Sequence, residues 1–327
     1  MNTVTTKILS VIAVLTIALF GLAGCGSTTE ETSVSQTVNL AVLNGPTGMG
    51  AVQLTDMPEK YNVETYEAPT DIVPKLISGE VDAACLPSNM AAVLYNKTKG
   101  DIVAVTPVTL GVLSILGNSA EVSTPADLKG RTIVSSGQGG TPEYALQKIL
   151  AANGLTIYED VQVEWLASHA DVNTRLLTEE GTIAMVPEPF VSTATAKSDS
   201  VTVLFDMNEL WAEATGEDFP MGVLVATKTF AEERTGDLEA LLTDLSASID
   251  YVNSASDEAC QLIVDKGFLG DAGIAAKAIP NCSLVCYTGE DAETGNRMLK
   301  VFNETMFEMN PEAVGGSLPG DDMYWGK

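Results

Sequence analysis

The stretch "TLGVLSILGNS", Thr109 to Ser119, decides the fold, because it is an apolar, glycine-containing run between two parts of similar organisation. A second run of this kind, "FPMGVLVATKTF", spans Phe219 to Phe230. Between the two runs lie roughly 100 residues with their own alternation of strand-like and helix-like segments. We therefore expect an inserted lobe with two connections to the first, although a single continuous domain would be consistent with the same pattern.

Apolar, β-branched segments alternate with helical patterns over most of the chain, which favours an α/β fold with largely parallel sheets. The expected strands are "TVNLAVL", "VDAACL", "DIVAVTPV", "GVLSIL", "RTIVSS", "VQVEWL", "TIAMV", "SVTVLF" and "GVLVATK". We expect lobe 1 over residues 38–115 and 222–318, lobe 2 over 116–221, and a C-terminal tail over 319–327. A ligand would then bind in the cleft between the lobes, beyond the carboxyl ends of the strands.

Five of the predicted strands are followed directly by a predicted helix start. In the first of these loops, "LNGPTGMGAV", Gly45 and Gly50 have the spacing of a nucleotide-binding P-loop. A P-loop needs Lys and then Ser or Thr after the second glycine, and this chain has Ala51 and Val52 there. The turn and the helix start are therefore expected, but nucleotide chemistry is not.

The other four loops also carry helix-start signals and polar side chains. They are "LPSNMAAV" with Ser88, "SSGQGGTPEY" with Thr141 before Pro142, "LASHADV" with His169 in the first turn, and "MVPEPF" with Glu188. Each hydroxyl could simply cap its own helix, but parallel strands end at one edge, so the loops are expected to face one cleft. Helix N-termini favour a polar or anionic ligand. Because the five loops contain no Lys or Arg, backbone amides and hydroxyls would have to hold an anion.

The sequence offers little for catalysis. We find no useful Ser/His/acid spacing and no G-x-S-x-G elbow. Glu143 and Glu188 could act as paired carboxylates in a hydrolase, but each is better explained as an acidic residue at a helix N-terminus or as a ligand contact.

The N-terminus predicts export. "ILSVIAVLTIALFGLAGC", Ile8 to Cys25, is a short apolar run after Lys7 that ends in small residues, as a secretory signal does. Its last four residues fit the bacterial lipobox, so we expect removal of residues 1–24 and lipidation of Cys25. A transmembrane anchor with an incidental cysteine is the alternative. Residues 25–37 are polar and are expected to form a flexible tether.

Charge and cysteine content exclude several classes of partner. The chain has 17 basic and 44 acidic residues and a net charge of −27, which argues against nucleic acid and anionic lipid surfaces. The cysteines after Cys25 are Cys85, Cys260, Cys282 and Cys286. The last two lie in "NCSLVCY", an expected strand, and are too far apart there to bridge. A Cys260–Cys282 disulfide is a candidate, because the protein is expected to be exported. With a single histidine and no CxxC, a zinc site is not expected.

Several of these motifs, taken in order, resemble one family. The lipobox, "NGPTGMG", "TDIVPKLISGEVDAACLPSNMAAVLYNK", "ADLKGRTIVSSGQGGTPEYALQKILAANGL" and "VPEPF" are similar to those of ABC-importer solute-binding proteins of the nitrate/sulfonate/taurine/thiamine-precursor type. The resemblance runs from about Val38 to Leu318. It implies a type II periplasmic-binding-protein fold, with two lobes joined by two hinge strands and a ligand held between them.

The resemblance also implies the function and the site. It indicates a lipid-anchored, extracytoplasmic monomer without a cofactor that delivers a small polar organic molecule, sulfonate-like or thiamine-pyrimidine-like, to an ABC permease and its ATPase. The ligand-binding positions that we expect from it, including the whole first loop from Asn44 to Met49, are Asn44, Gly45, Pro46, Thr47, Gly48, Met49, Pro87, Ser88, Asn89, Gly140, Thr141, His169, Glu188 and Met221. Thiamine-pyrimidine synthases of similar sequence carry a cysteine cluster, whereas this chain has only Cys85 in that region. An enzyme of that kind and a ligand-sensing lipoprotein are the alternatives.

Overall fold

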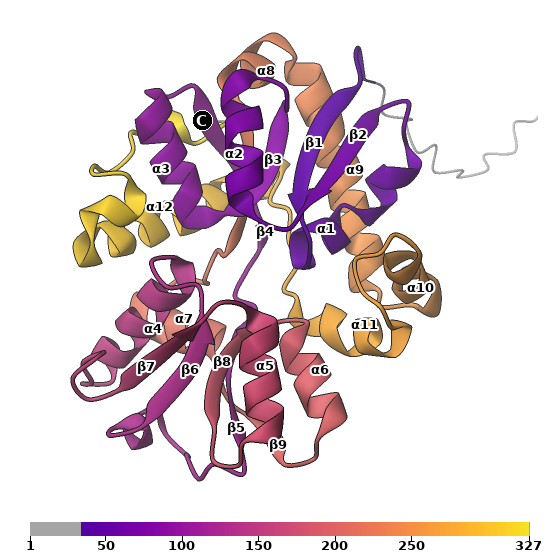
Figure 1. Cartoon of the computed structure of the whole chain (residues 1–327). Helices are drawn as coiled ribbons and strands as arrows, with labels where there is room; N and C mark the ends of the chain where they lie inside the picture. The colour runs from indigo at the N-terminus through magenta and orange to yellow at the C-terminus, as the bar shows by residue number, and fades with distance from the viewer. Residues whose placement is uncertain (1–33, 327) are drawn as a thin grey trace, which may run out of the picture. The chain divides into compact units, whose positions relative to one another are not determined.

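Two five-stranded β-sheets organise the protein in a computed structural model that describes residues 34–326 (Figure 1). The first sheet has the strand order β2-β1-β3-β10-β4. Its strands are β1 (Val38–Leu43), β2 (Tyr61–Tyr66), β3 (Ala83–Pro87), β4 (Ile102–Thr109) and β10 (Gly222–Thr227). We call this sheet and the helices packed on it the first lobe.

The second sheet is built by the chain between β4 and β10 and has the order β7-β6-β8-β5-β9. Its strands are β5 (Leu113–Asn118), β6 (Thr132–Ser136), β7 (Gln162–Leu166), β8 (Ile183–Pro187) and β9 (Val201–Asp206). This sheet and its helices are called the second lobe. The chain crosses between the lobes at residues 110–112 and again at residues 216–221.

Each sheet is parallel except for one strand, and that strand is the first one after a crossing. β10 runs antiparallel to both β3 and β4, and β5 runs antiparallel to β8 and β9. A chain that enters a sheet at the edge where the parallel strands end must run the opposite way. The expectation of largely parallel sheets is therefore correct, with the two crossing strands as the exceptions.

Helices cover both faces of both sheets. The α-helices are α1 (Pro46–Gly50), α2 (Pro69–Ser78), α3 (Ser88–Thr98), α4 (Thr141–Ala152), α5 (His169–Thr178), α6 (Phe190–Lys197), α7 (Met207–Thr215), α8 (Lys228–Glu233), α9 (Thr235–Asn253), α10 (Asp257–Asp265), α11 (Ala272–Ala278) and α12 (Ala292–Met309). The short 3-10 helices are η1 (Val52–Asp56), η2 (Pro125–Leu128), η3 (Ile279–Asn281), η4 (Gly289–Asp291), η5 (Pro311–Val314) and η6 (Asp321–Met323).

One hydrophobic core runs through both lobes. It packs α2, α3 and α12 on one face of the first sheet and continues to α4 and α7 of the second lobe. At the junction, the ring of Trp211 on α7 stacks on Phe219 with centroids 4.5 Å apart, and Phe302 on α12 lies 5.9 Å from Trp211. The opposite face of the first sheet is covered by α1 and α8 to α11, and that of the second by α5 and α6. Because Phe219 belongs to the second crossing, these aromatic rings pack that crossing against α7 and α12.

The structure differs from the sequence expectations in several places. β2 was not predicted, because its side chains are mostly exposed and polar. "NCSLVCY" is not a strand but forms one bridge, between Leu284 and Thr109. β5 begins at Leu113, two residues before the expected end of the first-lobe segment at residue 115. In the expected tail, the buried Tyr324 bridges to Ala104 of β4.

The predicted signal peptide, Cys25 and most of the tether lie outside the described residues. Within residues 34–326, no helix combines the length and apolar character needed to cross a membrane. The four cysteines of this range are free thiols, so the bridge considered between Cys260 and Cys282 is not formed. The thiol of Cys260 instead lies 3.7 Å from the carbonyl oxygen of Ala255, in the turn that precedes α10.

Candidate functional site

The loops predicted to bind a ligand lie at the edge of each sheet where the chain crosses. In the first sheet, the last residues of β3 and β4, Pro87 and Thr109, are both paired with Gly222, the first residue of β10. In the second sheet, Leu113 at the start of β5 is paired with Pro187 at the end of β8. The carboxyl ends of the parallel strands are thus gathered around the two crossings (Figure 1).

A side-chain hydrogen bond joins the two lobes at this edge. The Thr141 hydroxyl, at the start of α4, donates to Asn89 Oδ1, at the start of α3, over 3.0 Å. Both residues are buried, with 3% and 9% of their surface exposed. The residues that precede these helices, Pro87 and Gly140, make no side-chain cap. Two helix N-termini from different lobes therefore meet here, with backbone N–H groups that no side chain caps.

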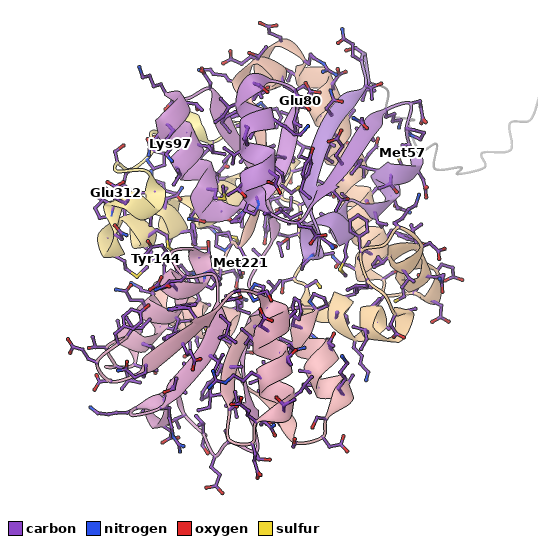
Figure 2. All side chains as sticks on the ribbon, in the orientation of Figure 1. Met57, Glu80, Lys97, Tyr144, Met221 and Glu312 are labelled. Carbon is purple, nitrogen blue, oxygen red and sulfur yellow. The ribbon has the colours of Figure 1, made fainter. Side chains whose placement is uncertain are left out.

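Met221, the last residue of the second crossing, lies between the two sheets (Figure 2). Its carbonyl oxygen accepts a hydrogen bond of 3.0 Å from the Ser88 amide, and its own amide donates to the Thr109 carbonyl oxygen over 2.9 Å. Its sulfur lies 3.5 Å from the amide nitrogen of Val112, and the Val112 carbonyl oxygen accepts from the Glu188 amide. Met221 thus links two of the predicted loops to the first crossing, the Ser88 loop directly and the Glu188 loop through Val112.

The first loop takes part mainly through its backbone. Gly45 has a φ of 115°, a conformation that favours glycine, and starts the short helix α1. The Thr47 hydroxyl donates to the Leu43 carbonyl oxygen over 3.1 Å. Asn44 turns outward, where its side-chain amide donates to Glu67. Met49 is fully buried in the first-lobe core, so the structure does not bring its side chain to the edge.

His169 lies at the start of α5 in the second lobe. Its Nδ1 is 2.6 Å from the hydroxyl oxygen of Ser136, the last residue of β6, and its ring lies 5.7 Å from that of Phe190. Burial lowers the pKa of His169 to about 4. The imidazole is therefore neutral at neutral pH and can exchange hydrogen bonds without carrying charge.

Glu188 is 2% exposed and is engaged with its own helix α6. Its carboxylate accepts hydrogen bonds from the Ser192 amide and hydroxyl, at 3.1 and 3.0 Å. Burial raises the pKa of Glu188, and the Ser192 hydrogen bonds oppose that rise. A cavity of about 120 Å³ behind the first crossing is lined by Glu188 and Asn281 among others. Glu188 thus reaches the site through its backbone contact with Val112, while its carboxylate is held by α6.

The structure also shows residues that the sequence did not single out. Ser136 orients His169, and Tyr144 on α4 accepts a second inter-lobe hydrogen bond, 2.9 Å from Asn310 at the end of α12 (Figure 2). Thr109 is buried at the end of β4 and faces Gly222. The only sequence signal for Ser136 was its place at the end of a predicted strand, and that for Thr109 was its place at the start of the first crossing run. Nothing in the local pattern marked Asn310.

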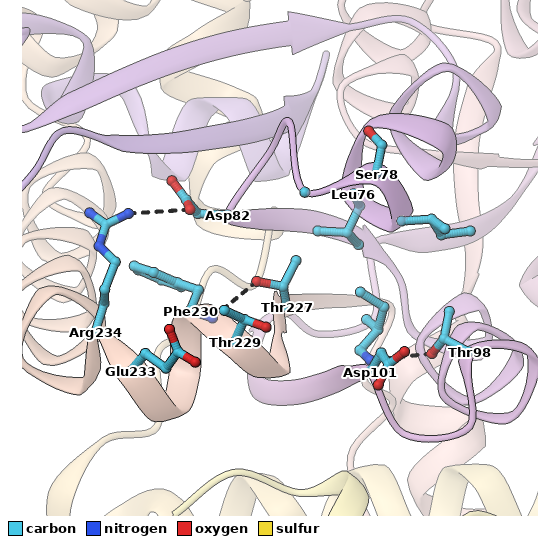
Figure 3. Close-up of a pocket in the computed structure, with 13 residues that line it drawn as sticks. Leu76, Ser78, Asp82, Thr98, Asp101, Thr227, Thr229, Phe230, Glu233 and Arg234 are labelled. Carbon is cyan, nitrogen blue, oxygen red and sulfur yellow. Dashed lines mark hydrogen bonds and ion pairs between the residues drawn. The ribbon is translucent and has the colours of Figure 1, made fainter.

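A larger cavity, about 440 Å³, lies at the opposite edge of the first sheet (Figure 3). It is bordered by Ile102 at the start of β4 and Thr227 at the end of β10. The candidate site lies at the other ends of these two strands, where β4 ends and β10 begins. Arg234 in its wall is paired with Asp82 at 3.2 Å. This cavity is therefore separate from the predicted loops. Within residues 34–326 no group of three His, Cys, Asp or Glu side chains could hold a metal ion.

Comparison with known proteins identifies the family. The model of the NMT1-like family matches residues 49–264, which is more than half of the chain. The chain belongs to the NMT1-like family. The predicted relationship to the nitrate/sulfonate type of ABC solute-binding proteins is thereby confirmed. No curated protein matches this NMT1-like chain in a sequence search.

Solved structures confirm the fold of this NMT1-like protein. An ABC transporter protein from Parabacteroides distasonis has 22% identity and a TM-score of 0.75, over 89% of this chain and 99% of that one. The periplasmic aliphatic sulphonate-binding protein SsuA from Escherichia coli has 18% identity and a TM-score of 0.66, over 86% and 90%. A Candida albicans protein described as having the generic periplasmic binding protein fold has 18% identity and a TM-score of 0.57, over 88% and 92%. The predicted α/β, two-lobed periplasmic-binding-protein fold is therefore correct.

Proposed function

We propose that this protein is a membrane-anchored, extracytoplasmic solute-binding protein that captures a small polar organic molecule between its two lobes and delivers it to an ABC importer permease and its ATPase. The observation that carries this proposal is the meeting of two helix N-termini from different lobes at the Asn89–Thr141 hydrogen bond. A ligand that inserts between these helices would interact with both lobes at once. Its binding energy would then favour the closed arrangement over the open one.

The similar structures support a transport role. One is described as an ABC transporter protein and another as a periplasmic binding protein for aliphatic sulphonates. For this chain we propose a ligand with a sulfonate-like or thiamine-pyrimidine-like polar group. The proposed binding residues are the predicted set, with Thr47, Ser88, Asn89, Thr141, His169 and Met221 contributing side chains or exposed loop backbone.

Charge at the edge is consistent with a ligand held by neutral groups. The side chains that meet there are hydroxyls, an amide, a thioether and a neutral imidazole. Such groups bind polar molecules by directed hydrogen bonds, each worth about 1 kcal/mol net. A handful of them, with burial of the ligand, is enough for a dissociation constant near about 1 μM, or roughly −8 kcal/mol.

We infer binding rather than catalysis from the state of the two candidate acids. The Glu188 carboxylate is occupied by Ser192. Glu143 accepts a hydrogen bond of 2.6 Å from the Gly139 amide and is also bonded to the Tyr158 hydroxyl. Both carboxylates therefore serve local structure in this arrangement.

The proposal extends to the termini and the lobe limits. We propose that the chain is cleaved before Cys25 and that the Cys25 thiol is lipidated. The protein would then be a monomer that the tether holds at the outer face of the cell membrane. We propose that the first lobe comprises residues 38–115 and 222–318 and the second 116–221, except that residues 113–115, which begin β5, belong to the second lobe.

Native mass spectrometry of the purified protein tests the proposed function, because a captured ligand would appear as a fixed added mass. Titration calorimetry with that molecule then follows for Thr47→Ala, Ser88→Ala and Thr141→Ala. Each is expected to weaken binding several-fold, through the loss of one hydrogen bond of about 1 kcal/mol. Thr174→Ala on the exposed face of α5 is the matched control. Unchanged affinity in all three site variants would refute the proposed site. Chemical turnover of the molecule would show that the protein is an enzyme rather than a binding protein.

A further inference from the structure

Two buried hydroxyls at the edge of the first sheet lack a hydrogen-bond partner among the described residues. They are Ser88 Oγ, at the start of α3, and Thr109 Oγ1, at the end of β4. The two residues are 1% and 3% exposed. A buried polar group without a partner is costly to fold and is rare in native proteins, so two in one region need an explanation.

The two hydroxyls belong to residues on either side of Met221 and Gly222, where the second crossing enters β10. Met221 is hydrogen-bonded through its carbonyl to the Ser88 amide and through its amide to the Thr109 carbonyl, so its backbone lies between the two residues. The next residue, Gly222, is paired with the strand ends on both sides. A Cβ atom at Gly222 would lie 3.0 Å from Thr109 Oγ1 and 3.1 Å from Thr47 Cγ2. Any side chain at position 222 would therefore crowd the Thr109 hydroxyl and the Thr47 methyl group, and glycine avoids that contact.

Backbone donors lie next to this position. Ser88 is the first residue of the eleven-residue helix α3, whose N-terminus no side chain caps. The amides of the first helical turn thus add N–H donors and the positive end of the helix dipole. Hydroxyls can donate as well as accept, so this surface offers several donors to one group. A chemical group with several acceptor atoms is its natural partner.

We propose that Thr109 is a ligand-binding residue and that its hydroxyl and that of Ser88, on either side of Met221 and Gly222, receive a ligand head group with at least two hydrogen-bond acceptors. This inference rests on the proposed function and specifies the chemistry of the same site. Thr109 directly precedes the first crossing, residues 110–112. A ligand that binds Thr109 therefore contacts the chain where the lobes move relative to each other, and opening of the lobes gives access to the buried hydroxyls.

The sign of a stability change distinguishes this role from a structural one. Thr109→Val and Ser88→Ala remove a hydroxyl that satisfies nothing in the ligand-free protein, so the melting temperature of that protein should rise by roughly 1–3 °C. Thr106→Val on the same strand is the matched control. Thr106 is 2% exposed. Its hydroxyl accepts a hydrogen bond from the Tyr287 amide over 3.0 Å and donates one to the Tyr287 carbonyl oxygen over 3.1 Å. Its loss should lower the melting temperature by roughly 2–4 °C or more.

Ligand binding gives the second arm of the experiment. The protein is unfolded, dialysed and refolded to remove bound molecules, and is then titrated with methanesulfonate, taurine, MOPS, acetate and any molecule found by native mass spectrometry. Thr109→Val and Ser88→Ala should each weaken binding of the best of these roughly three- to tenfold. Thr106→Val should leave the dissociation constant within about twofold of that of the unsubstituted protein.

The outcomes are separable. If no molecule binds the unsubstituted protein, the proposed function fails and this inference fails with it. If a molecule binds and Thr109→Val leaves its affinity unchanged, only the inference is overturned. A fall in the ligand-free melting temperature of both Thr109→Val and Ser88→Ala, as in Thr106→Val, would also overturn it, because the hydroxyls would then be satisfied by bound water or another internal group. A rise in stability together with a loss of affinity supports it.

Discussion

Removal of the inter-lobe hydrogen bond between Thr141 and Asn89 should destabilise the protein by an amount that the geometry sets. Thr141→Val keeps the side-chain volume and deletes only the hydroxyl that donates to Asn89 over 3.0 Å. The loss of a neutral hydrogen bond costs about 1 kcal/mol, and the Asn89 carbonyl is then left unpaired in a site where both residues are less than 10% exposed. We therefore expect the free energy of unfolding to fall by about 1–2 kcal/mol.

A double-mutant cycle isolates the bond from other effects of each substitution. Urea unfolding is measured for Thr141→Val, Asn89→Ala and the double variant, and the coupling energy should be about 0.5–1.5 kcal/mol. Thr174→Val, on the exposed face of α5 in the same lobe, serves as control and should change stability by less than about 0.5 kcal/mol. A coupling energy below about 0.3 kcal/mol would show that the two side chains do not interact, and the contact between the starts of α3 and α4 would then be wrong.

Two further predictions concern packing and pH. A methyl group at Gly48 would lie against the Phe268 ring and 2.8 Å from the Leu43 carbonyl oxygen. Gly48→Ala should therefore cost about 1–3 kcal/mol in urea unfolding, whereas Gly236→Ala, in open space on helix α9, should stabilise by up to about 1 kcal/mol; equal effects would contradict the packing. Because burial lowers the pKa of His169 to about 4, against 6.5 as its ordinary value, the unfolded chain binds the proton first as pH falls. The stability that this group contributes is complete above about pH 6.5 and is lost toward pH 4. Between pH 7 and pH 4, the unfolding free energy of the unsubstituted protein should therefore fall by about 2–3 kcal/mol more than that of His169→Asn. Parallel pH profiles would place the imidazole in solvent.

Most of the strands that the sequence predicted have buried, β-branched runs, although the predicted β7 and β9 are largely unburied. β4 is buried at every position and stands out in the sequence as a result. β2, "YNVETY", lies at the edge of the first sheet and buries only Tyr61 fully, so its polar residues conceal it. "NCSLVCY" misled in the opposite way, because its apolar residues pack into the first-lobe core from an irregular segment. Apolar content reports burial, and burial alone does not specify a strand.

The candidate site was predictable where a helix-start signal coincided with a strand end. Ser88, Asn89 and Thr141 carried that signal, and the structure brings their helices together. Thr109 carried no such signal, since its environment is created by Gly222, more than one hundred residues away in the chain. Met49 shows the converse limit: it belongs to the right loop, but the turn of α1 directs its side chain into the core. Which face of a short helix is buried depends on partners that a local pattern does not contain.

The position of the site follows from the direction of the two crossing strands. β5 and β10 each begin at the edge where their parallel neighbours end, so both connections between the lobes arise at the edge that carries the predicted binding loops. Met221 and Val112, one from each crossing, are in contact there, and Thr109 and Gly222 are paired beside them. In the proposed site, a ligand at this edge would contact both the loops and the crossing segments. We therefore expect ligand binding and lobe closure to be coupled, and substitutions in the crossings to alter affinity and lobe opening together.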